Sequence, residues 1–337
     1  MNETATLNKR RPFIALEEHF AYAPELLDAT DIQNPYYYIL KYLPGIKEQL
    51  LDVGPGRIET MDEGNITLQV LSHLPVSPKL DYHQSRAVNN KIAEAVKAHP
   101  SRFAGFATLP VGDPTRCPEE LTRAVKELGF LGALIEGHTD DNAYYDGYDY
   151  LPMWQTAQDL DVPIYLHPTW PTDVSLVSQF QGNFPPLHSN FLSSFIFGWH
   201  SDTAIHILRL FASGLFDRLP RLKLIIGHMG ETLPFMLERI ATITSLWGLE
   251  RNFTSVWQEN IWITTSGSWS LNPMACILRN TALDHVLFSV DYPFSSNMGA
   301  QRFFRELAES GLVDDAQLDA IAYKNAERLL GITVANT

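Results

Sequence analysis

Residues 163–168 read PIYLHP, and a run of the same kind recurs as KLIIGH at residues 223–228. Both runs are short and almost continuously apolar, instead of alternating between apolar and polar residues. Strands of a parallel sheet are covered on both faces and show this continuous pattern. Six more runs of this kind lie at residues 12–18, 68–74, 103–110, 132–137, 261–267 and 286–291. The chain is therefore predicted to contain eight strands that are buried on both faces.

Helical patterns separate these runs. In segment 86–98, Val88, Ile92 and Val96 recur at helical spacing and form one apolar face. Similar patterns lie at residues 117–128, 202–216, 231–247 and 314–330. Eight strands that alternate with helices predict an α/β fold, and specifically a (β/α)8 TIM barrel in place of a doubly wound sheet. Neither GxGxxG nor a P-loop motif follows any of the strands, which disfavours a nucleotide-binding sheet.

Composition excludes several classes of partner. The 337 residues include 25 Lys and Arg against 39 Asp and Glu, a formal net charge of −14. Such an acidic chain without a basic cluster is not expected to bind nucleic acid. No run of about 18 apolar residues is present, and residues 1–11 lack the apolar segment of a signal peptide, so no membrane association is expected. Cys117 and Cys276 are too few for a disulfide framework and are expected to be reduced, as in a cytoplasmic protein.

We expect residues 1–337 to form a single barrel domain, because no repeat, linker or low-complexity tract divides the chain. Residues 1–11 form a short N-terminal extension. Two long insertions, residues 21–54 and 169–201, are rich in aromatic residues and follow predicted strands, so they overhang the barrel face where active sites form. Aromatic loops there suit a flat, partly apolar ligand. Contact with a neighbouring subunit is an equally open interpretation.

Carboxylate and imidazole side chains lie at the ends of several predicted strands. Glu17 and His19 end the first strand, His167 ends the fifth and Asp291 ends the eighth. Because side chains alternate along a strand, Glu17 and His19 share one side and Glu18 points the other way. Two imidazoles and two carboxylates that converge at one mouth of a barrel suit Zn²⁺, Mn²⁺ or another divalent ion. We therefore predict one divalent metal ion, with Zn²⁺ favoured and Mn²⁺ or Mg²⁺ as alternatives.

The segment GHMGE at residues 227–231 contains a second candidate pair. Glu231 lies three residues after His228, in the first turn of the predicted helix, from where it can reach back to the imidazole. A carboxylate on one ring nitrogen raises the basicity of the other nitrogen, as a general acid or base requires. The alternative is that Glu231 serves the helix N-terminus, where negative charge is favourable. We predict a catalytic or substrate-orienting role for the pair.

Other residues are open to two interpretations on the sequence alone. Trp199 is a candidate ring-stacking wall, or it packs at the start of a helix. Arg239 is a candidate contact for an anionic substrate, or it forms a surface ion pair. His73 and His138 are weaker pocket candidates, whereas His206 is expected to be solvated or to cap a helix.

Several stretches resemble the decarboxylases of the amidohydrolase superfamily: IALEEHF (14–20), PIYLHP (163–168), ITTSG (263–267), LFSVDYPF (287–294) and a long block (203–240) that contains GLFDRLPRLKLIIGHMGE. The group includes the aminocarboxymuconate semialdehyde decarboxylases, and the nearer resemblance is to the γ-resorcylate and other hydroxybenzoate decarboxylases. The resemblance to these decarboxylases implies a distorted (β/α)8 barrel. It also implies a metal held by Glu17, His19, His167 and Asp291, a catalytic pair at His228 and Glu231, and substrate contacts at Arg239 and Trp199.

The resemblance implies the reaction as well, which is non-oxidative loss of CO2 from an aromatic acid with an ortho hydroxyl. The reaction needs no organic cofactor and is reversible under high bicarbonate. We assign Asp291 as the proton donor to the ring carbon, with His228 and Glu231 orienting the substrate and handling the phenol proton. The substrate stays open among salicylate, methylsalicylate, orsellinate and the dihydroxybenzoates. Such enzymes usually form dimers or tetramers, so we expect a homodimer or homotetramer, with Trp247 and Trp257 either at the interface or in the core.

Two other functions compete with this one. A metal-dependent hydrolase of a lactone or amide can use the same barrel and metal. It is disfavoured by the Glu-x-His start and by the end of the fourth strand, where Glu136 and His138 stand and binuclear hydrolases often carry a bridging lysine. A non-catalytic protein that binds aromatic acids is disfavoured because all four candidate metal ligands are present.

Overall fold

The computed structural model describes residues 11–334, so the predicted N-terminal extension lies outside the described residues except for Arg11. The strands are arranged in two sheets, in the orders β1–β2–β3 and β4–β5–β6–β7–β8, and all their pairings are parallel. Each strand overlaps one of the eight predicted runs. Their bounds are β1 Ile14–Phe20, β2 Leu68–His73, β3 Phe103–Gly105, β4 Ala133–Glu136, β5 Ile164–His167, β6 Leu224–Ile226, β7 Ile261–Thr264 and β8 Val286–Leu287.

Two isolated parallel bridges join the edges of the two sheets. Ala107 pairs with Ala133, which links the end of β3 to β4. Glu18 pairs with Tyr292, which links β1 to the chain that leaves β8. The strands therefore form a ring, which confirms the predicted (β/α)8 barrel. Because each of the two seams is an isolated bridge and not a full ladder, the barrel is distorted.

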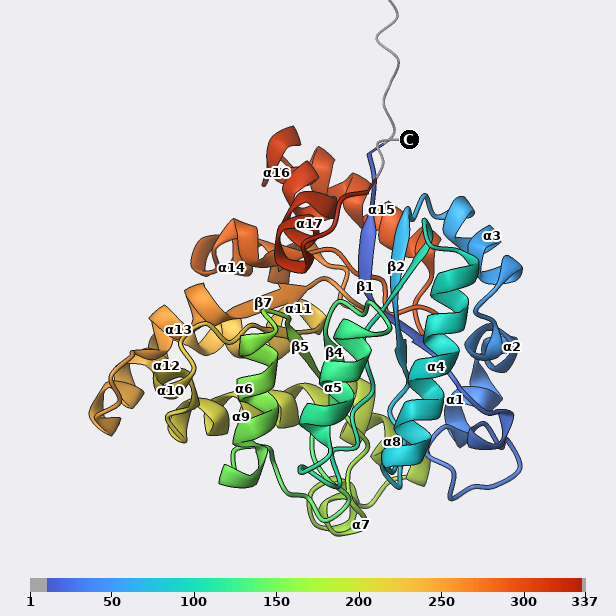
Figure 1. The fold of residues 1–337 in the computed structure, drawn as a ribbon, viewed down its shortest axis with the longest axis horizontal. Coiled ribbons are helices and arrows are strands. Elements are labelled where there is room, and N and C mark those ends of the chain that lie inside the picture. Colours follow the sequence, from blue (N-terminus) through green and yellow to red (C-terminus); the bar gives the residue numbers. More distant parts are fainter. Residues whose placement is uncertain (1–10, 335–337) are drawn as a thin grey trace, which may run out of the picture.

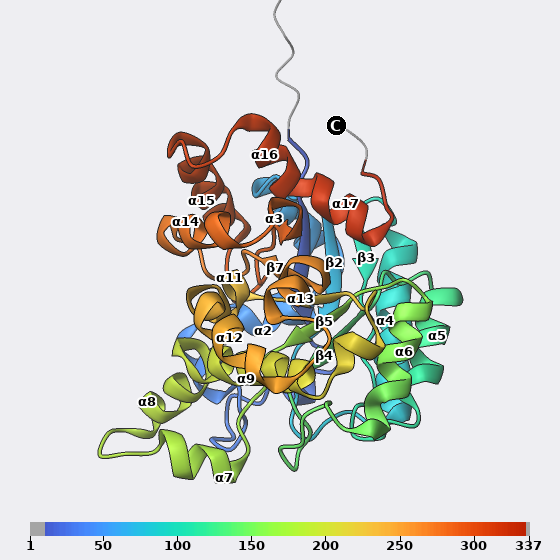
Figure 2. The same cartoon turned by 90° about the vertical axis from the view of Figure 1, so that its left-hand side faces the viewer.

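Helices follow the strands and cover the outside of the barrel (Figure 1). The longer ones are α3 Pro55–Glu63, α4 Tyr82–Ala98, α5 Cys117–Lys126, α6 Leu151–Asp159, α9 Gly198–Ala212, α12 Leu237–Thr244, α13 Phe253–Asn260, α14 Leu271–Asn280 and α15 Asn297–Glu309. The shorter ones are α1 Tyr37–Tyr42, α2 Ile46–Leu51, α7 Asp173–Ser175, α8 Pro186–Phe191, α10 Leu215–Arg218, α11 His228–Glu231, α16 Asp315–Asp319 and α17 Asn325–Leu330. In both views α7 and α8 lie at the end of the molecule opposite α16 and α17 (Figure 2). Between residues 11 and 334, no helix is both long and apolar enough to cross a membrane.

Local signals set the helix boundaries. α4 begins at Tyr82, earlier than predicted, because the Asp81 side chain accepts a hydrogen bond from the Gln84 amide and the Gln84 side chain accepts one from the Asp81 amide. The predicted helix 202–216 is divided into α9 and α10 at Gly214, whose φ of 72° suits glycine.

The continuous apolar runs are explained by the two buried faces of each strand. In β1, Ile14 and Leu16 pack inside the barrel, whereas Ala15 and the preceding Phe13 pack against the helices outside. The interior cluster also contains Ala326 and Leu329 of α17, and its other buried members are Leu68, Val70, Phe106, Leu134, Tyr165, Ile225 and Leu287. The apolar interior therefore lies on the α17 side of the barrel, and polar side chains are left to the carboxyl ends of the strands.

A buried polar layer lies on the outer face of β1. Arg57 of α3 is fully buried, and it donates from Nε to Gln69 Oε1 (2.8 Å) and from Nη1 to the His19 carbonyl oxygen (2.9 Å). Gln69 in turn donates to Glu18 Oε2 (3.0 Å). Burial lowers the pKa of Arg57 to about 10 and raises the pKa of Glu18 to about 8. Arg57 thus remains a buried cation that holds the backbone of β1 in place.

Replacing Arg57 with alanine leaves the Gln69 amide oxygen and the His19 carbonyl without this donor. We expect the free energy of unfolding to fall by about 2–4 kcal/mol, the range for a broken buried polar network. Arg116→Ala is the control, because Arg116 is 51% exposed and pairs with Glu119 on the surface. This variant is expected to lower the free energy of unfolding by less than about 1 kcal/mol. Denaturant unfolding followed by circular dichroism measures both variants, and equal losses would contradict the anchoring role of Arg57.

Candidate active site and metal centre

One extra residue in β1 determines which side chains reach the barrel mouth. The pairing of β1 with β2 shifts between Ala15 and Glu18, so Leu16 and Glu17 together oppose the single residue Val70. Such a bulge re-aims the side chains at and beyond it. Simple alternation from the inward-facing Leu16 would point Glu18 into the barrel. With the bulge, Glu17 points inward and Glu18 points outward to the buried polar layer.

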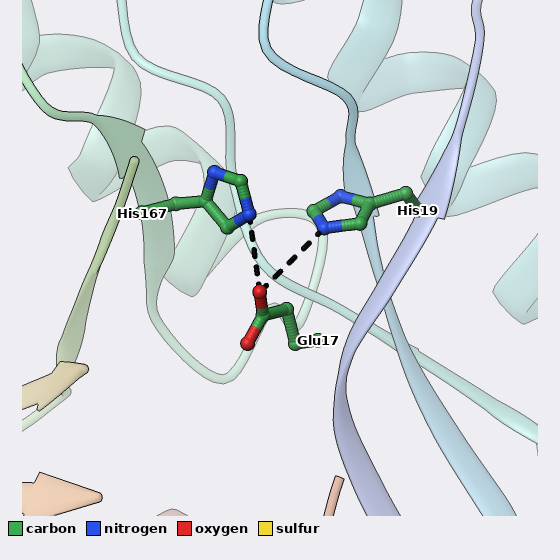
Figure 3. Close-up of side chains that lie close together, drawn as sticks. All are labelled: Glu17, His19 and His167. Atoms are coloured by element: carbon green, nitrogen blue, oxygen red, sulfur yellow. Dashed lines mark ion pairs between the residues drawn. The ribbon is translucent and has the colours of Figure 1, made fainter. Parts of the chain in front are cut away.

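The Glu17 carboxylate lies at the centre of the site. Its Oε1 is 3.1 Å from His167 Nε2, 3.7 Å from His228 Nε2 and 3.9 Å from His19 Nε2. Figure 3 shows the imidazoles of His19 and His167 pointing at this oxygen from different strands. Oε2 accepts a hydrogen bond from the hydroxyl of Tyr165, which belongs to the interior cluster. The structure therefore brings three of the four predicted metal ligands into direct proximity.

The donor set fits a divalent cation. Glu17 Oε1 and His19 Nε2 are buried and have no hydrogen-bond partner within the described residues. His167 Nδ1 lies 2.7 Å from the Pro168 carbonyl oxygen, which places the ring proton on Nδ1 and leaves the Nε2 lone pair facing Glu17. Asp291 Oδ1 lies 3.5 Å from His19 Nε2. Two imidazoles and two carboxylates with free lone pairs are ligands that Zn²⁺ and Mn²⁺ accept.

The charges of the cluster also favour a cation. Burial would raise the pKa of Glu17, but the charge of the nearby His228 imidazole is the largest opposing effect, and the pKa lies well below its usual range. Burial and the nearby Glu17 carboxylate raise the pKa of Asp291 well above its usual range. Two buried carboxylates that compete for ionisation are both stabilised as anions when a cation lies between them.

The backbone is strained where two of the strands end. Asp291, His228 and Glu231 have φ angles of 68°, 48° and 52°, in a region that residues with a Cβ rarely adopt. Such strain persists where the surrounding structure holds it, and it concentrates at functional sites. At Asp291 the amide donates to the Glu17 carbonyl (3.1 Å) across the seam between β8 and β1. The strained residue is thereby fixed to the strand that carries the other ligands.

The turn after β6 is left-handed, and the prediction of a continuous helix over residues 231–247 is wrong. Residues 228–232 all have positive φ, which Gly230 adopts freely, and Pro234 starts the next helical turn. The chain then forms a 3-10 helix at Leu233–Met236, α12, and a second 3-10 helix at Ser245–Trp247. Glu231 therefore does not stand in the first turn of a long helix.

Glu231 is held between two imidazoles. Its Oε1 accepts from His228 Nδ1 (2.8 Å) and its Oε2 accepts from His200 Nδ1 (2.6 Å). His200 Nε2 lies 3.1 Å from the Phe195 carbonyl oxygen. Both nitrogens of the His200 ring therefore face acceptor oxygens, which fixes the orientation of the ring beside Glu231. Burial would lower the pKa of His228, but the carboxylates of Glu231 and Glu17 outweigh burial and raise this pKa to about 10.

Close packing at the end of β6 requires glycine at position 227. A Cβ atom on Gly227 would lie 2.8 Å from Glu17 Oε2, 3.0 Å from the Tyr165 hydroxyl and 3.1 Å from the Ser266 hydroxyl. Both hydroxyls donate to Glu17 Oε2. Any side chain at residue 227 would therefore displace the carboxylate at the centre of the site.

A cavity of about 1050 Å³ opens beside the cluster. His228, Asp291 and His200 lie in its wall. Side chains from residues 38–43 of the first long insertion and residues 191–199 of the second also line it. The aromatic insertions therefore face the same space as the candidate catalytic residues.

The two candidate substrate contacts, Trp199 and Arg239, have different places in the structure, and Trp199 is the one that lines the cavity. Trp199 is buried in the cavity wall, with its ring centroid 6.3 Å from that of His167. Arg239 is exposed on α12 and does not line the cavity of the described chain. His73 and His138 are buried, but they do not line the cavity either.

Sequence reasoning missed His200 and misplaced His206. His200 stands at neither a strand end nor a recognisable motif, and its position directly after Trp199 was the one available signal. The expectation that His206 is solvated or caps a helix is wrong, because that face of α9 packs inward and His206 is fully buried, where its Nε2 accepts from the Tyr145 amide (3.1 Å). Trp257 lies in the core, so the interface interpretation of this residue is wrong.

The sequence matches the amidohydrolase family over residues 68–332. The decarboxylase orsB of Emericella nidulans is 47% identical over 329 residues, which cover 95% of this chain and 97% of that protein. The γ-resorcylate decarboxylase of a Polaromonas species is 36% identical over 335 residues, which cover 94% of this chain and 97% of that protein.

Solved structures give the same result. The 2,6-dihydroxybenzoate decarboxylase from Rhizobium, in complex with 2,6-dihydroxybenzoate, has a TM-score of 0.82 at 34% identity, with 95% of this chain and 99% of that chain covered. The dihydroxybenzoic acid decarboxylase from Polaromonas, with bound manganese and the inhibitor 2-nitroresorcinol, has a TM-score of 0.84 at 34% identity, with 95% and 97% covered. The chain therefore belongs to the amidohydrolase family, in which these relatives are decarboxylases.

Proposed function

We propose that this protein is a carboxy-lyase that catalyses the metal-dependent, non-oxidative decarboxylation of an ortho-hydroxybenzoic acid. The products are the phenol and CO2, and high bicarbonate drives the reverse carboxylation. The observation that carries the proposal is the cluster of Glu17, His19, His167 and Asp291 beside a cavity with aromatic walls. Relatives that are 47% and 36% identical along nearly the whole chain are decarboxylases, which supports the same chemistry here.

The four clustered residues, Glu17, His19, His167 and Asp291, would hold one divalent ion. When bound, such an ion draws charge from the substrate's carboxylate and ortho oxygen and increases the phenolate character of the ring. The nitrogen and oxygen donors support Zn²⁺. Manganese in the similar Polaromonas structure supports Mn²⁺ equally, and Mg²⁺ is the third candidate. No organic cofactor is part of this proposal.

Asp291 is the proposed proton donor. Loss of CO2 from an intact ring would leave an aryl carbanion, so the ring carbon that bears the carboxylate is protonated first. The bond to CO2 then breaks, and its electron pair returns to the ring and restores aromaticity. Asp291 lines the cavity and also lies beside the metal cluster, with Oδ1 3.5 Å from His19 Nε2, so its carboxyl can reach a substrate ring that is held there. Solvent returns a proton to Asp291 for the next turnover.

His228 is the proposed group that orients the substrate and handles the phenol proton. Its Nδ1 is held by Glu231, which leaves Nε2 on the side of the metal cluster. His200 holds the other oxygen of Glu231 and thereby fixes the carboxylate that fixes His228. Trp199 supplies a wall against which the substrate ring stacks. Arg239 has no part in this proposal because it is exposed away from the cavity.

The proposed substrate has one carboxylate and few further polar groups. No lysine or arginine of the described residues lines the cavity, and Asp291 is the one carboxylate that does so. The walls are mainly aromatic and aliphatic, which suits a ring with an apolar substituent. This pattern favours salicylate, a methylsalicylate or orsellinate over an acid with several further ring hydroxyls.

We propose a homodimer or homotetramer in the cytoplasm. Leu246 is 82% exposed and the adjacent Trp247 is half-exposed, which is typical of a surface that another subunit covers. The free cysteines Cys117 and Cys276 support a reducing compartment. One apolar cluster contains residues from all eight strands or their flanks, which supports a single domain.

The reaction class is tested with a panel of acids. Purified protein is expected to release CO2 from salicylate, 6-methylsalicylate or orsellinate, and not from benzoate or 3-hydroxybenzoate, because only an ortho hydroxyl feeds electrons to the carbon that is protonated. Asp291→Asn is expected to lower kcat by at least about 100-fold. Product phenols are measured by chromatography. Comparable turnover of benzoate, or full activity in Asp291→Asn, would exclude this mechanism.

The metal site is tested by metal content. Glu17→Gln removes the central negative charge and is expected to lower divalent-metal affinity by more than about 100-fold, since even second-shell changes give 10- to 100-fold losses. Elemental analysis after dialysis measures this loss. Glu119→Gln is the matched control because its side chain is 52% exposed on α5. A chelated sample refilled with Zn²⁺ or Mn²⁺ identifies the active ion, and a full complement of metal in Glu17→Gln refutes the site.

The role of His200 is tested by two substitutions. His200→Ala leaves Glu231 with one imidazole partner and is expected to lower kcat by about 10- to 100-fold, with a smaller change in KM and a shifted pH profile. His200→Gln is expected to recover part of kcat, because its amide nitrogen carries two donors for Glu231 and the Phe195 carbonyl. His188→Ala, an exposed histidine of α8, is the control. Wild-type kcat, KM and pH profile in His200→Ala would disprove the positioning role.

A further inference from the structure

Few side chains of the active-site cavity can pair with a charged group on a substrate. His200, His228 and Asp291 line it beside the metal cluster. Among its lining residues, all of which lie in the described part of the chain, there is no lysine, arginine or glutamate. A second charged group on the substrate would therefore be buried without a partner, which is unfavourable.

The remaining walls are largely apolar, and their uncharged polar members are Tyr38, Tyr42, Thr232, Ser268, Asn272 and Ser295. Many of the apolar wall residues come from four separate parts of the chain. These are α1 with the following Leu43, the segment of α8 and the π-helical turn Leu192–Ile196, the 3-10 helix Leu233–Met236, and α14. Together they contribute a set that we call the alkyl subsite: Ile39, Leu43, Phe191, Ile196, Phe235 and Cys276. Leu43, Ile196 and Phe235 are 43%, 64% and 82% exposed. Exposed apolar surface next to a substrate site is stabilised when an apolar group covers it.

The cavity is larger than a bare hydroxybenzoic acid requires. Its volume of about 1050 Å³ stands at the upper end of the roughly 300–1,000 Å³ that drug-sized ligands occupy. A salicylate is a single ring with two small substituents, and it fills only the part beside the metal cluster. The space that remains is bounded by the alkyl subsite.

We infer that the alkyl subsite binds an uncharged alkyl chain of several carbons on the aromatic ring, so that the favoured substrates are alkyl-substituted ortho-hydroxybenzoic acids. The inference rests on the proposed decarboxylase function and names its substrate class. The carboxylate and the ortho hydroxyl lie at the metal cluster, and the chain lies along the apolar walls. A fully buried methylene strengthens binding by about three- to fourfold, so partly open walls give about twofold for each methylene.

A chain-length series tests this inference. The substrates are 2,4-dihydroxy-6-alkylbenzoates with methyl, propyl and pentyl chains. We expect kcat/KM to rise by about twofold per added methylene, mainly through a lower KM. Turnover of the methyl acid tests the proposed function. The ratio of kcat/KM for the pentyl acid to kcat/KM for the methyl acid (the pentyl-to-methyl ratio) tests the alkyl subsite. A ratio of one or less overturns the subsite and leaves the decarboxylase function intact.

A second measurement does not depend on turnover. Cys276 lies in the wall of the alkyl subsite, whereas Cys117 is fully buried and serves as an internal reference. Maleimide labelling of each cysteine is followed by mass spectrometry in the presence of 5-methylresorcinol or 5-pentylresorcinol. The pentyl compound is expected to protect Cys276 at a concentration at least about tenfold lower. Equal protection by the two compounds, or a Cys276 that is unreactive without either because a second subunit covers it, overturns the inference.

Two matched variants on α14 test whether a change in chain-length preference comes from the alkyl subsite itself or from adding a phenyl ring anywhere on this helix. Cys276→Phe fills the space and is expected to bring the pentyl-to-methyl ratio of kcat/KM down to about one. Arg279→Phe adds the same ring on the exposed side of α14, away from the cavity, and is expected to leave this ratio unchanged. A ratio in Cys276→Phe that equals the ratio in Arg279→Phe counts against the alkyl subsite.

Discussion

The bulge in β1 is the constraint on which the active site depends. Because Leu16 and Glu17 share one partner on β2, the strand presents an apolar residue and then a carboxylate to the same interior. Without the extra residue, Glu18 would enter the barrel and Glu17 would face the helices. The bulge therefore allows one short strand to belong to the apolar core at its start and to the metal centre at its end.

The same strand also separates opposite charges. On its inner side, the carboxylates of Glu17 and Asp291 require a cation or protons. On its outer side, the buried guanidinium of Arg57 holds the backbone and the Gln69–Glu18 pair. Buried charges are tolerated only where partners surround them, so both layers have to be complete for β1 to keep its position. The stability of the fold around β1 and the geometry of the metal site therefore depend on the same residues.

Local patterns in the sequence were sufficient for the strands and for most of the candidate ligands. A continuous apolar run followed by Glu, His or Asp identifies a buried strand and its functional end, as at Glu17 and His167. The sequence IALEEHF does not reveal the bulge, because the strand would bury an apolar face with or without the extra residue. The left-handed turn in GHMGE looks like a helix start, since the strain is held by tertiary contacts. His200 depends on Glu231, 31 residues away, and no spacing rule relates the two.

The seam between β8 and β1 determines when the active site can form. There the His19 amide donates to the Tyr292 carbonyl (2.7 Å) and the Asp291 amide donates to the Glu17 carbonyl (3.1 Å), so the hydrogen bonds that close the ring are made by the ligand residues and their neighbour. These partners are separated by most of the described chain, so the ring cannot close before both segments are present. During synthesis, the metal centre therefore stays incomplete until the last strand has left the ribosome.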